Sequence, residues 1–166
     1  MVNEGRLVNE KRRALVNDIY ERYTTEIENS FVNTTICENN DLRSKRVTGT
    51  KQTDIVFEHM DSVSAVMKYA GEDTAILNFA NYETPGGGFL YGAMAQEEAL
   101  CLESTLYPVI SNHEFYYKEN RQSLNYVGVL YSNRALWSPG IVFFRDGKEK
   151  YCDVITCAAP NASAYL

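Results

Sequence analysis

Apolar residues recur with helical spacing at the start of the chain, within a segment rich in Lys, Arg, Glu and Asn. This pattern predicts one or two amphipathic helices between residues 3 and 29, although a solvated polar face gives the same spacing. We therefore expect residues 1–30 to be a helical extension that precedes a separate region, residues 31–166. The positions that define the pattern are Leu7, Ala14, Leu15, Ile19 and Tyr23.

Further along, short apolar runs bounded by polar or glycine-containing segments predict β-strands. We expect the run that ends at Ala80 to be the central strand of the sheet. The predicted strands are Val32–Glu38, Asp54–Phe57, Thr74–Ala80, Val127–Tyr131, Ile141–Phe144 and Cys152–Thr156.

Between these runs, helical spacing and boundary residues predict three helices. Strands interleaved with helices indicate an α/β fold. The first predicted helix is capped by Asp61 or Ser62 and runs to about Ala70. The second runs from Ala93 to about Tyr107, where Pro108 stops it, and the third runs from Asn112 to Gln122.

Length, charge and cysteine spacing exclude several classes of protein. A chain of 166 residues fits one domain, and a net charge of −6 argues against broad binding to duplex nucleic acid, but not against a small anionic ligand held by backbone amides. We expect a cytoplasmic protein without a signal peptide or membrane span, because no apolar run approaches the length that either needs. The four cysteines and two histidines match no metal-binding spacing, so we expect free thiols, no metal, no cofactor and chemistry that depends on carboxylates.

The stretch AILNFANYETPGGGFLYGAMAQEEALC, residues 75–101, combines a strand, a triple glycine and a helix start with two adjacent glutamates. Such a strand, loop and helix can bind phosphate, because glycines admit close backbone approach and the helix start presents free N–H groups. Each part alone has a structural explanation, since glycines form turns and acidic residues complement the helix dipole. Consecutive helix positions point about 100° apart, so we expect Glu97 and Glu98 to have different roles.

The combination is more specific than its parts. Spaced as GGG-FLYGAMA-QEE, it resembles the microbial-type poly(ADP-ribose) glycohydrolase family, and ILNFAN, ALCLESTLYP and DVITCAAPN are similar to the same family. The resemblance covers most of Asp54–Asn161. It implies a macrodomain-like three-layer α/β/α fold with a mixed sheet in residues 31–166. It also implies an enzyme that cleaves ribose–ribose O-glycosidic bonds of poly(ADP-ribose), on modified proteins or free, to release ADP-ribose.

The resemblance assigns the catalytic roles to the two glutamates. Glu98 would be the acid that protonates the leaving ribose hydroxyl, and Glu97 would hold the hydroxyls near the scissile bond. Protonation by a carboxylic acid suits a reaction that passes through an oxocarbenium-like transition state.

The binding roles come from the same resemblance. Gly86, Gly87 and Gly88 would line the diphosphate and the terminal ribose, and Asn81 would hydrogen-bond the ribose hydroxyls. Phe89 would pack beside the terminal ribose, and Gln96 would support the loop or the helix start.

The end of the sequence departs from the family. Family members continue into a C-terminal portion with a second glycine-rich phosphate loop and an aromatic residue that stacks on adenine, and neither follows Asn161. The alternative hypothesis is therefore a non-catalytic or fragmentary macrodomain that binds ADP-ribose. A third hypothesis is an unrelated α/β protein in which the glycines and acidic residues are structural. If the region is truncated, the apolar strand DVITCAA lacks a cover, and we expect self-association through its edge.

Overall fold

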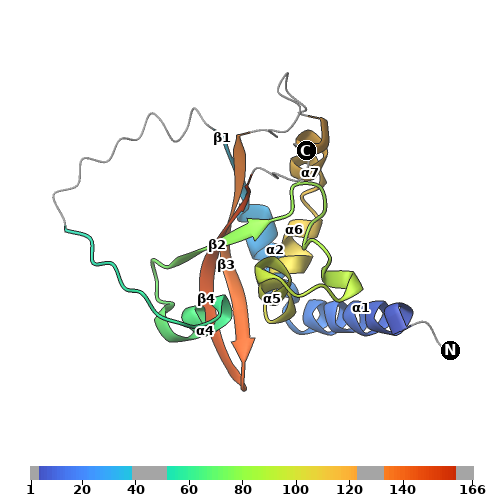
Figure 1. Cartoon of the computed structure of the whole chain (residues 1–166), viewed down its shortest axis with the longest axis horizontal. Coiled ribbons are helices and arrows are strands. Elements are labelled where there is room, and N and C mark those ends of the chain that lie inside the picture. The colour runs from blue at the N-terminus through green and yellow to red at the C-terminus, as the bar shows by residue number, and fades with distance from the viewer. Residues whose placement is uncertain (1–3, 39–51, 123–132, 160–166) are drawn as a thin grey trace.

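The computed structural model describes residues 4–38, 52–122 and 133–159, which form a mixed four-stranded sheet with helices packed against it (Figure 1). The described strands are β1 (Thr35–Glu38), β2 (Ala75–Ala80), β3 (Arg134–Arg145) and β4 (Lys148–Ala158). The described helices are α1 (Glu4–Arg22), α2 (Thr24–Asn33), α4 (Ser62–Tyr69), α5 (Gln96–Leu102), α6 (Leu106–Ser111) and α7 (Glu114–Gln122), with a short 3-10 helix η1 (Phe89–Tyr91).

The sheet is built around a long antiparallel hairpin of β3 and β4, with the order β1-β3-β4-β2. β1 pairs antiparallel with β3, and β2 pairs parallel with β4 in a register that places Asn78 opposite Thr156. Asp146 and Gly147 form the hairpin turn, both with positive φ, as Asp-Gly turns between strands require. The sheet is therefore mixed, as the sequence predicts.

Several predicted elements are confirmed. Two helices occupy the N-terminal segment and meet at Tyr23, and Asp61 caps α4 by accepting a hydrogen bond from Ser64 N at 3.0 Å. The strand that ends at Ala80 and the helix that ends at Gln122 are present.

The predicted position of the strand before the glycine loop is wrong. β2 lies at one end of the described sheet, because the β3–β4 hairpin takes the inner places. The apolar DVITCAA segment is consequently not an open edge, since β4 has a hydrogen-bonded strand on each side.

The predicted helix from Ala93 to Tyr107 is also wrong, because it is two helices. Between α5 and α6, Ser104 bridges to Phe143, and Thr105 N donates to the Val142 carbonyl oxygen at 2.9 Å. Pro108 does not stop a helix. It lies in the first turn of α6, where a backbone N–H has no helical partner to lose.

Four strand predictions differ from the structure. Residues 32 and 33 belong to α2, residues 54–57 form no strand, and the strands around Ile141 and Cys152 are longer than expected. The predicted strand Val127–Tyr131 lies outside the described residues.

The two faces of the sheet have different surroundings. One face carries completely buried side chains such as Leu136, Val154 and Thr156 and packs against the helices. The other face presents exposed apolar side chains, four of which we call the open face: Leu77 (43% exposed), Phe79 (62%), Trp137 (40%) and Ile155 (38%).

Candidate active site

The site begins where β2 ends. Asn81 follows the strand, and its Oδ1 accepts hydrogen bonds from Glu83 N at 2.9 Å and Thr84 N at 3.0 Å. This side-chain turn reverses the chain, as asparagine commonly does. The Asn81 backbone N–H donates to Glu97 Oε2 at 2.7 Å, so the strand end and the helix start are joined directly.

The triple glycine folds back on the two glutamates. Gly86 N donates to Glu97 Oε1 at 3.2 Å, and Gly88 N donates to Glu98 Oε1 at 2.8 Å. Gly87 N donates to the Thr84 carbonyl oxygen at 3.0 Å. The three amides are thus bonded within the protein, and a diphosphate that contacts them must replace an internal hydrogen bond.

Gly87 occupies the point where both carboxylates converge. Its φ is +55°, and an added Cβ would lie 2.6 Å from Glu98 Oε1 and 3.2 Å from Glu97 Oε2. Both distances are shorter than ordinary contacts, so only glycine fits here without displacing a glutamate.

Glu97 is the deeper of the two glutamates, with 3% of its surface exposed. Burial raises the pKa of Glu97, the N–H groups of Asn81 and Asn78 partly oppose this, and the neighbouring Glu98 charge adds to it, so that the pKa of Glu97 is about 7. Glu97 therefore keeps its proton close to neutral pH.

The raised pKa of Glu97 predicts how stability depends on pH. Between pH values of about 4.5 and about 7 the unfolded chain loses this proton while the folded chain keeps it, so the free energy of unfolding falls as pH rises. The full effect is about 3 kcal/mol. We expect Glu97→Gln to remove this decline, measured as the difference between the urea denaturation curves of the two proteins across that pH range. Parallel pH dependence in the two proteins would contradict the assignment.

Glu98 is also buried, with 7% exposed, and it spans the loop and the helix start. Its Oε1 accepts from Gly88 N, and its Oε2 accepts from Ala95 N at 3.1 Å. Glu98 therefore ties the third glycine to the residue that precedes α5.

Gln96 joins the start of α5 to the strand before the loop. Its Oε1 accepts from Phe79 N at 3.0 Å, and its Nε2 donates to the Leu77 carbonyl oxygen at 2.8 Å. Gln96 thus takes two backbone groups on the outer edge of β2 and fixes the first turn of α5 to the strand.

The Phe89 side chain packs away from the carboxylates. Its side chain is completely buried, with its ring centroid 5.0 Å from that of Tyr107 and the Arg12 guanidinium 5.2 Å from the ring centroid. This burial favours a packing role and argues against direct contact with a ribose.

Asn78 joins the site although sequence reasoning missed it. It is completely buried, and its Nδ2 lies 3.3 Å from both Glu97 Oε1 and Thr156 Oγ1 and donates to each. The available signal was a polar residue at a core-facing position within the apolar run AILNFA, because a buried amide is costly unless it is hydrogen-bonded.

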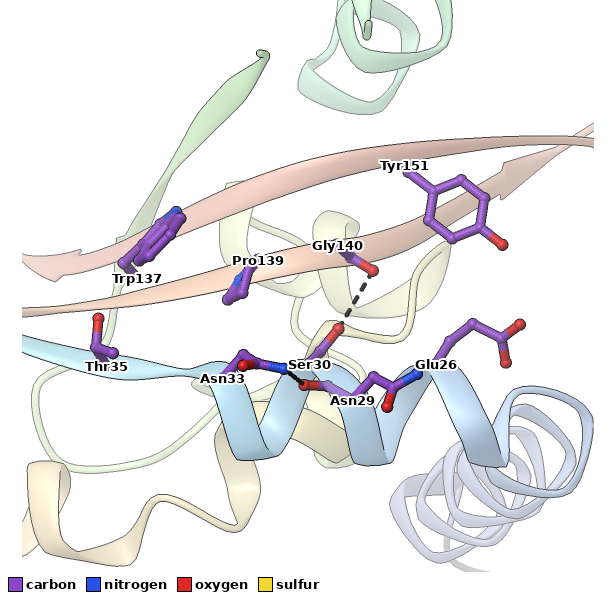
Figure 2. A pocket seen from close by; sticks show the side chains of 9 residues that line it. All are labelled: Glu26, Asn29, Ser30, Asn33, Thr35, Trp137, Pro139, Gly140 and Tyr151. Carbon is purple, nitrogen blue, oxygen red and sulfur yellow. Dashed lines mark hydrogen bonds between the residues drawn. The ribbon is translucent and has the colours of Figure 1, made fainter. Parts of the chain in front are cut away.

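A groove of about 620 Å³ lies elsewhere, between α2 and the β3–β4 hairpin. Figure 2 shows Trp137 and Pro139 on one strand, Tyr151 on the other, and Asn29 and Asn33 on the helix below them. None of its nine lining residues is a predicted site residue, so the groove is separate from the carboxylate pair.

In the described ranges, no group of three or more His, Cys, Asp or Glu side chains is arranged to hold a metal ion. The four cysteines are free, and Cys101 and Cys152 are buried. No described helix is both long enough and apolar enough to cross a membrane.

Fold and site together define a macrodomain-like α/β protein with a buried carboxylate pair beside a glycine loop. The family described as microbial-type PARG (poly(ADP-ribose) glycohydrolase), catalytic domain, matches residues 1–146. The chain therefore belongs to the microbial-type PARG family.

Solved structures agree with this assignment. Poly(ADP-ribose) glycohydrolase from Thermomonospora curvata superposes with a TM-score of 0.78 at 26% identity, over 93% of this chain and 66% of that one. The Deinococcus radiodurans enzyme in complex with ADP-ribose gives a TM-score of 0.72 at 34% identity, over 83% of this chain and 60% of that one. The chain thus spans less than two thirds of the length of these structures. A comparison with curated proteins found no match.

Proposed function

We propose that this protein hydrolyses the ribose–ribose O-glycosidic bonds of poly(ADP-ribose) and releases ADP-ribose. The observation that carries the proposal is the convergence of two buried glutamates on Gly87, with loop amides donating to both of them. Paired carboxyl groups are what glycoside hydrolysis requires. Family membership and the ADP-ribose in the Deinococcus radiodurans structure support the same substrate class.

Each glutamate has a distinct part in the proposed reaction. Glu98 protonates the leaving ribose hydroxyl and then accepts a proton from the attacking water, so the enzyme returns to its starting state. Glu97 positions the ribose hydroxyls, and its raised pKa keeps Glu97 itself protonated close to neutral pH. Asn81 Oδ1 is already bonded to Glu83 and Thr84, so its contact to a ribose hydroxyl comes from Nδ2.

ADP-ribose binding without turnover is the second candidate function. The observation in its favour is that the chain spans only 60–66% of the length of the two matched structures. Two measurements on the purified protein separate the candidates: calorimetric titration with ADP-ribose, and release of ADP-ribose from labelled polymer. Binding with release supports the hydrolase, binding without release supports the alternative, and no binding contradicts both.

We also propose a cytoplasmic location, which the four free cysteines support.

We further propose that the protein self-associates through the open face and not through a strand edge. Gln96 already occupies the Leu77 and Phe79 backbone groups on the outer edge of β2, so a second copy has the apolar side chains of the open face to bury instead. We expect Phe79→Ser to reduce concentration-dependent association measured by light scattering.

A matched control is Phe57→Ser, which changes a side chain that is 92% exposed and lies outside the sheet. It should leave association unchanged. A wild-type protein that stays monomeric at high concentration would contradict the proposal.

A further inference from the structure

The N-terminal helix α1 packs directly against η1, the turn that follows the triple glycine (Figure 1). Asn9 Nδ2 donates to the Leu90 carbonyl oxygen at 3.1 Å. Arg13 Nε donates to Asn9 Oδ1 at 2.8 Å, so the Asn9 amide is held with its Nδ2 toward η1. Two residues of α1 therefore act together on one backbone carbonyl of the loop.

A second contact encloses Phe89. The Arg12 guanidinium lies over the Phe89 ring, and its Nη2 donates to Met94 Sδ at 3.5 Å. Tyr107 of α6 contacts the same ring. The completely buried Phe89 is thus covered by α1 as well as by the macrodomain-like region, and a cation over an aromatic ring is attractive.

A third contact brings α1 very close to the loop backbone. Gly92 ends η1 with a φ of +84°, and an added Cβ would lie 2.6 Å from Val8 Cγ1. Glycine is therefore required both for the backbone conformation and for the approach of the helix.

One residue, Gly88, connects η1 to the carboxylates. Gly88 precedes η1, and its carbonyl oxygen accepts from Tyr91 N at 2.9 Å and Ala93 N at 3.1 Å, while its own N–H donates to Glu98. Any shift of η1 therefore moves the amide that holds Glu98 Oε1.

We propose that Asn9 and Arg12 are positioning residues, and that α1 clamps η1 so that Gly88 stays against Glu98. The helical segment expected to be a separate extension is then part of the support of the site. The effect on turnover rests on the proposed hydrolase function, whereas the clamp itself does not.

Hydrogen exchange of the loop amides tests the clamp independently of activity. Asn9→Asp keeps the shape and the contact to Arg13 but cannot donate to Leu90, and Arg12→Ala removes the cation over Phe89. We expect exchange at Gly86–Gly92 to become about fivefold faster in each variant, as loss of one hydrogen bond implies. Exchange in β4 serves as the internal reference for global stability and should not change. Unchanged loop exchange in both variants, or equal acceleration in β4, would overturn the proposal.

Arg6→Ala is the matched control, because it removes from the same helix an arginine whose ion pair among the described residues is with Glu10 on the surface. Its loop exchange should equal that of the wild type. Arg12→Lys retains a cation for Phe89 and should restore most of the protection that Arg12→Ala loses.

Turnover provides the second readout. If the wild type releases ADP-ribose, Asn9→Asp and Arg12→Ala should lower kcat about tenfold, Arg12→Lys should recover most of it, and Arg6→Ala should have no effect. Wild-type kcat in Asn9→Asp and Arg12→Ala despite faster loop exchange would reject the positioning role. A wild type with neither binding nor release would contradict the proposed function, while the exchange experiment would still decide whether α1 holds the loop.

Discussion

Glu98→Gln is expected to lower the release of ADP-ribose from labelled poly(ADP-ribose) by at least about 100-fold. Glutamine has nearly the same shape as glutamate but cannot transfer a proton to a departing ribose hydroxyl. ADP-ribose affinity, measured by calorimetry, should stay near that of the wild type, because the glycine loop and Asn81 are unchanged. Undiminished release would refute the assignment of Glu98 as the acid.

The structure indicates that Glu98→Gln also lowers stability, which the sequence did not reveal. Both carboxylate oxygens of Glu98 accept backbone N–H groups, from Gly88 and from Ala95, so the amide group of glutamine must face one of these donors. We therefore expect the variant to lose about 1–3 kcal/mol of stability as well. Release must be measured at a temperature where denaturation curves show that both proteins are folded.

Glu114→Gln separates this role from a simple interaction with a helix dipole. Glu114 is an exposed acidic residue in the first turn of α7, so its replacement removes only a favourable helix-terminus charge. It should cost about 0.3–1 kcal/mol and leave release unchanged. If Glu98→Gln behaved in the same way, the carboxylate of Glu98 would have only that structural role.

The arrangement of the site could be predicted where short-range signals dominate. The strand that ends at Ala80, the triple glycine and the helix that begins at Gln96 are separated by few residues, so their order in sequence is almost their order in space. Gln96 was expected to support the loop or the helix start, and in the structure its side chain hydrogen-bonds two backbone groups of β2.

Long-range contacts account for most of what the sequence could not predict. The break after α5 depends on Ser104 and Thr105 pairing with β3, which begins almost thirty residues later in the chain. Helical periodicity alone carries no information about that strand. Phe89 was expected to pack beside the terminal ribose, and in the structure Arg12 of α1 and Tyr107, which are far apart in the chain, both lie against its ring.

The sheet order could have been predicted better from a local signal. Asp146-Gly147 lies between two apolar runs and is a strong hairpin signal, and recognising it would have paired β3 with β4. That pairing leaves β2 at one end of the described sheet, where Gln96 can bind its outer edge. The position of the carboxylate pair beside the end of β2 therefore follows from the hairpin.

Gly87→Ala is expected to disrupt both the release and the binding of ADP-ribose, because an added Cβ would displace the two glutamates that converge on Gly87. The added Cβ would lie 2.6 Å from Glu98 Oε1, so the Glu98 carboxylate itself must move. A misplacement of about 1 Å can cost about 100-fold in rate. We expect a loss of that size in release, measured on labelled polymer, together with weaker ADP-ribose binding measured by calorimetry.

Gly147→Ala is the control that separates the effect of backbone strain from that of the contact between the added Cβ and the glutamates. Gly147 has a φ of +70°, close to the +55° of Gly87, but an added Cβ there meets no atom within 4 Å. Both alanine variants should lose about 1–2 kcal/mol of stability from the left-handed conformation, measured by urea denaturation. Only Gly87→Ala should impair release, because only its Cβ reaches the glutamates. Equal loss of release in the two variants would mean that backbone strain, and not the displacement of Glu98, explains the effect. Normal release by Gly87→Ala would show that Gly87 is not part of the site.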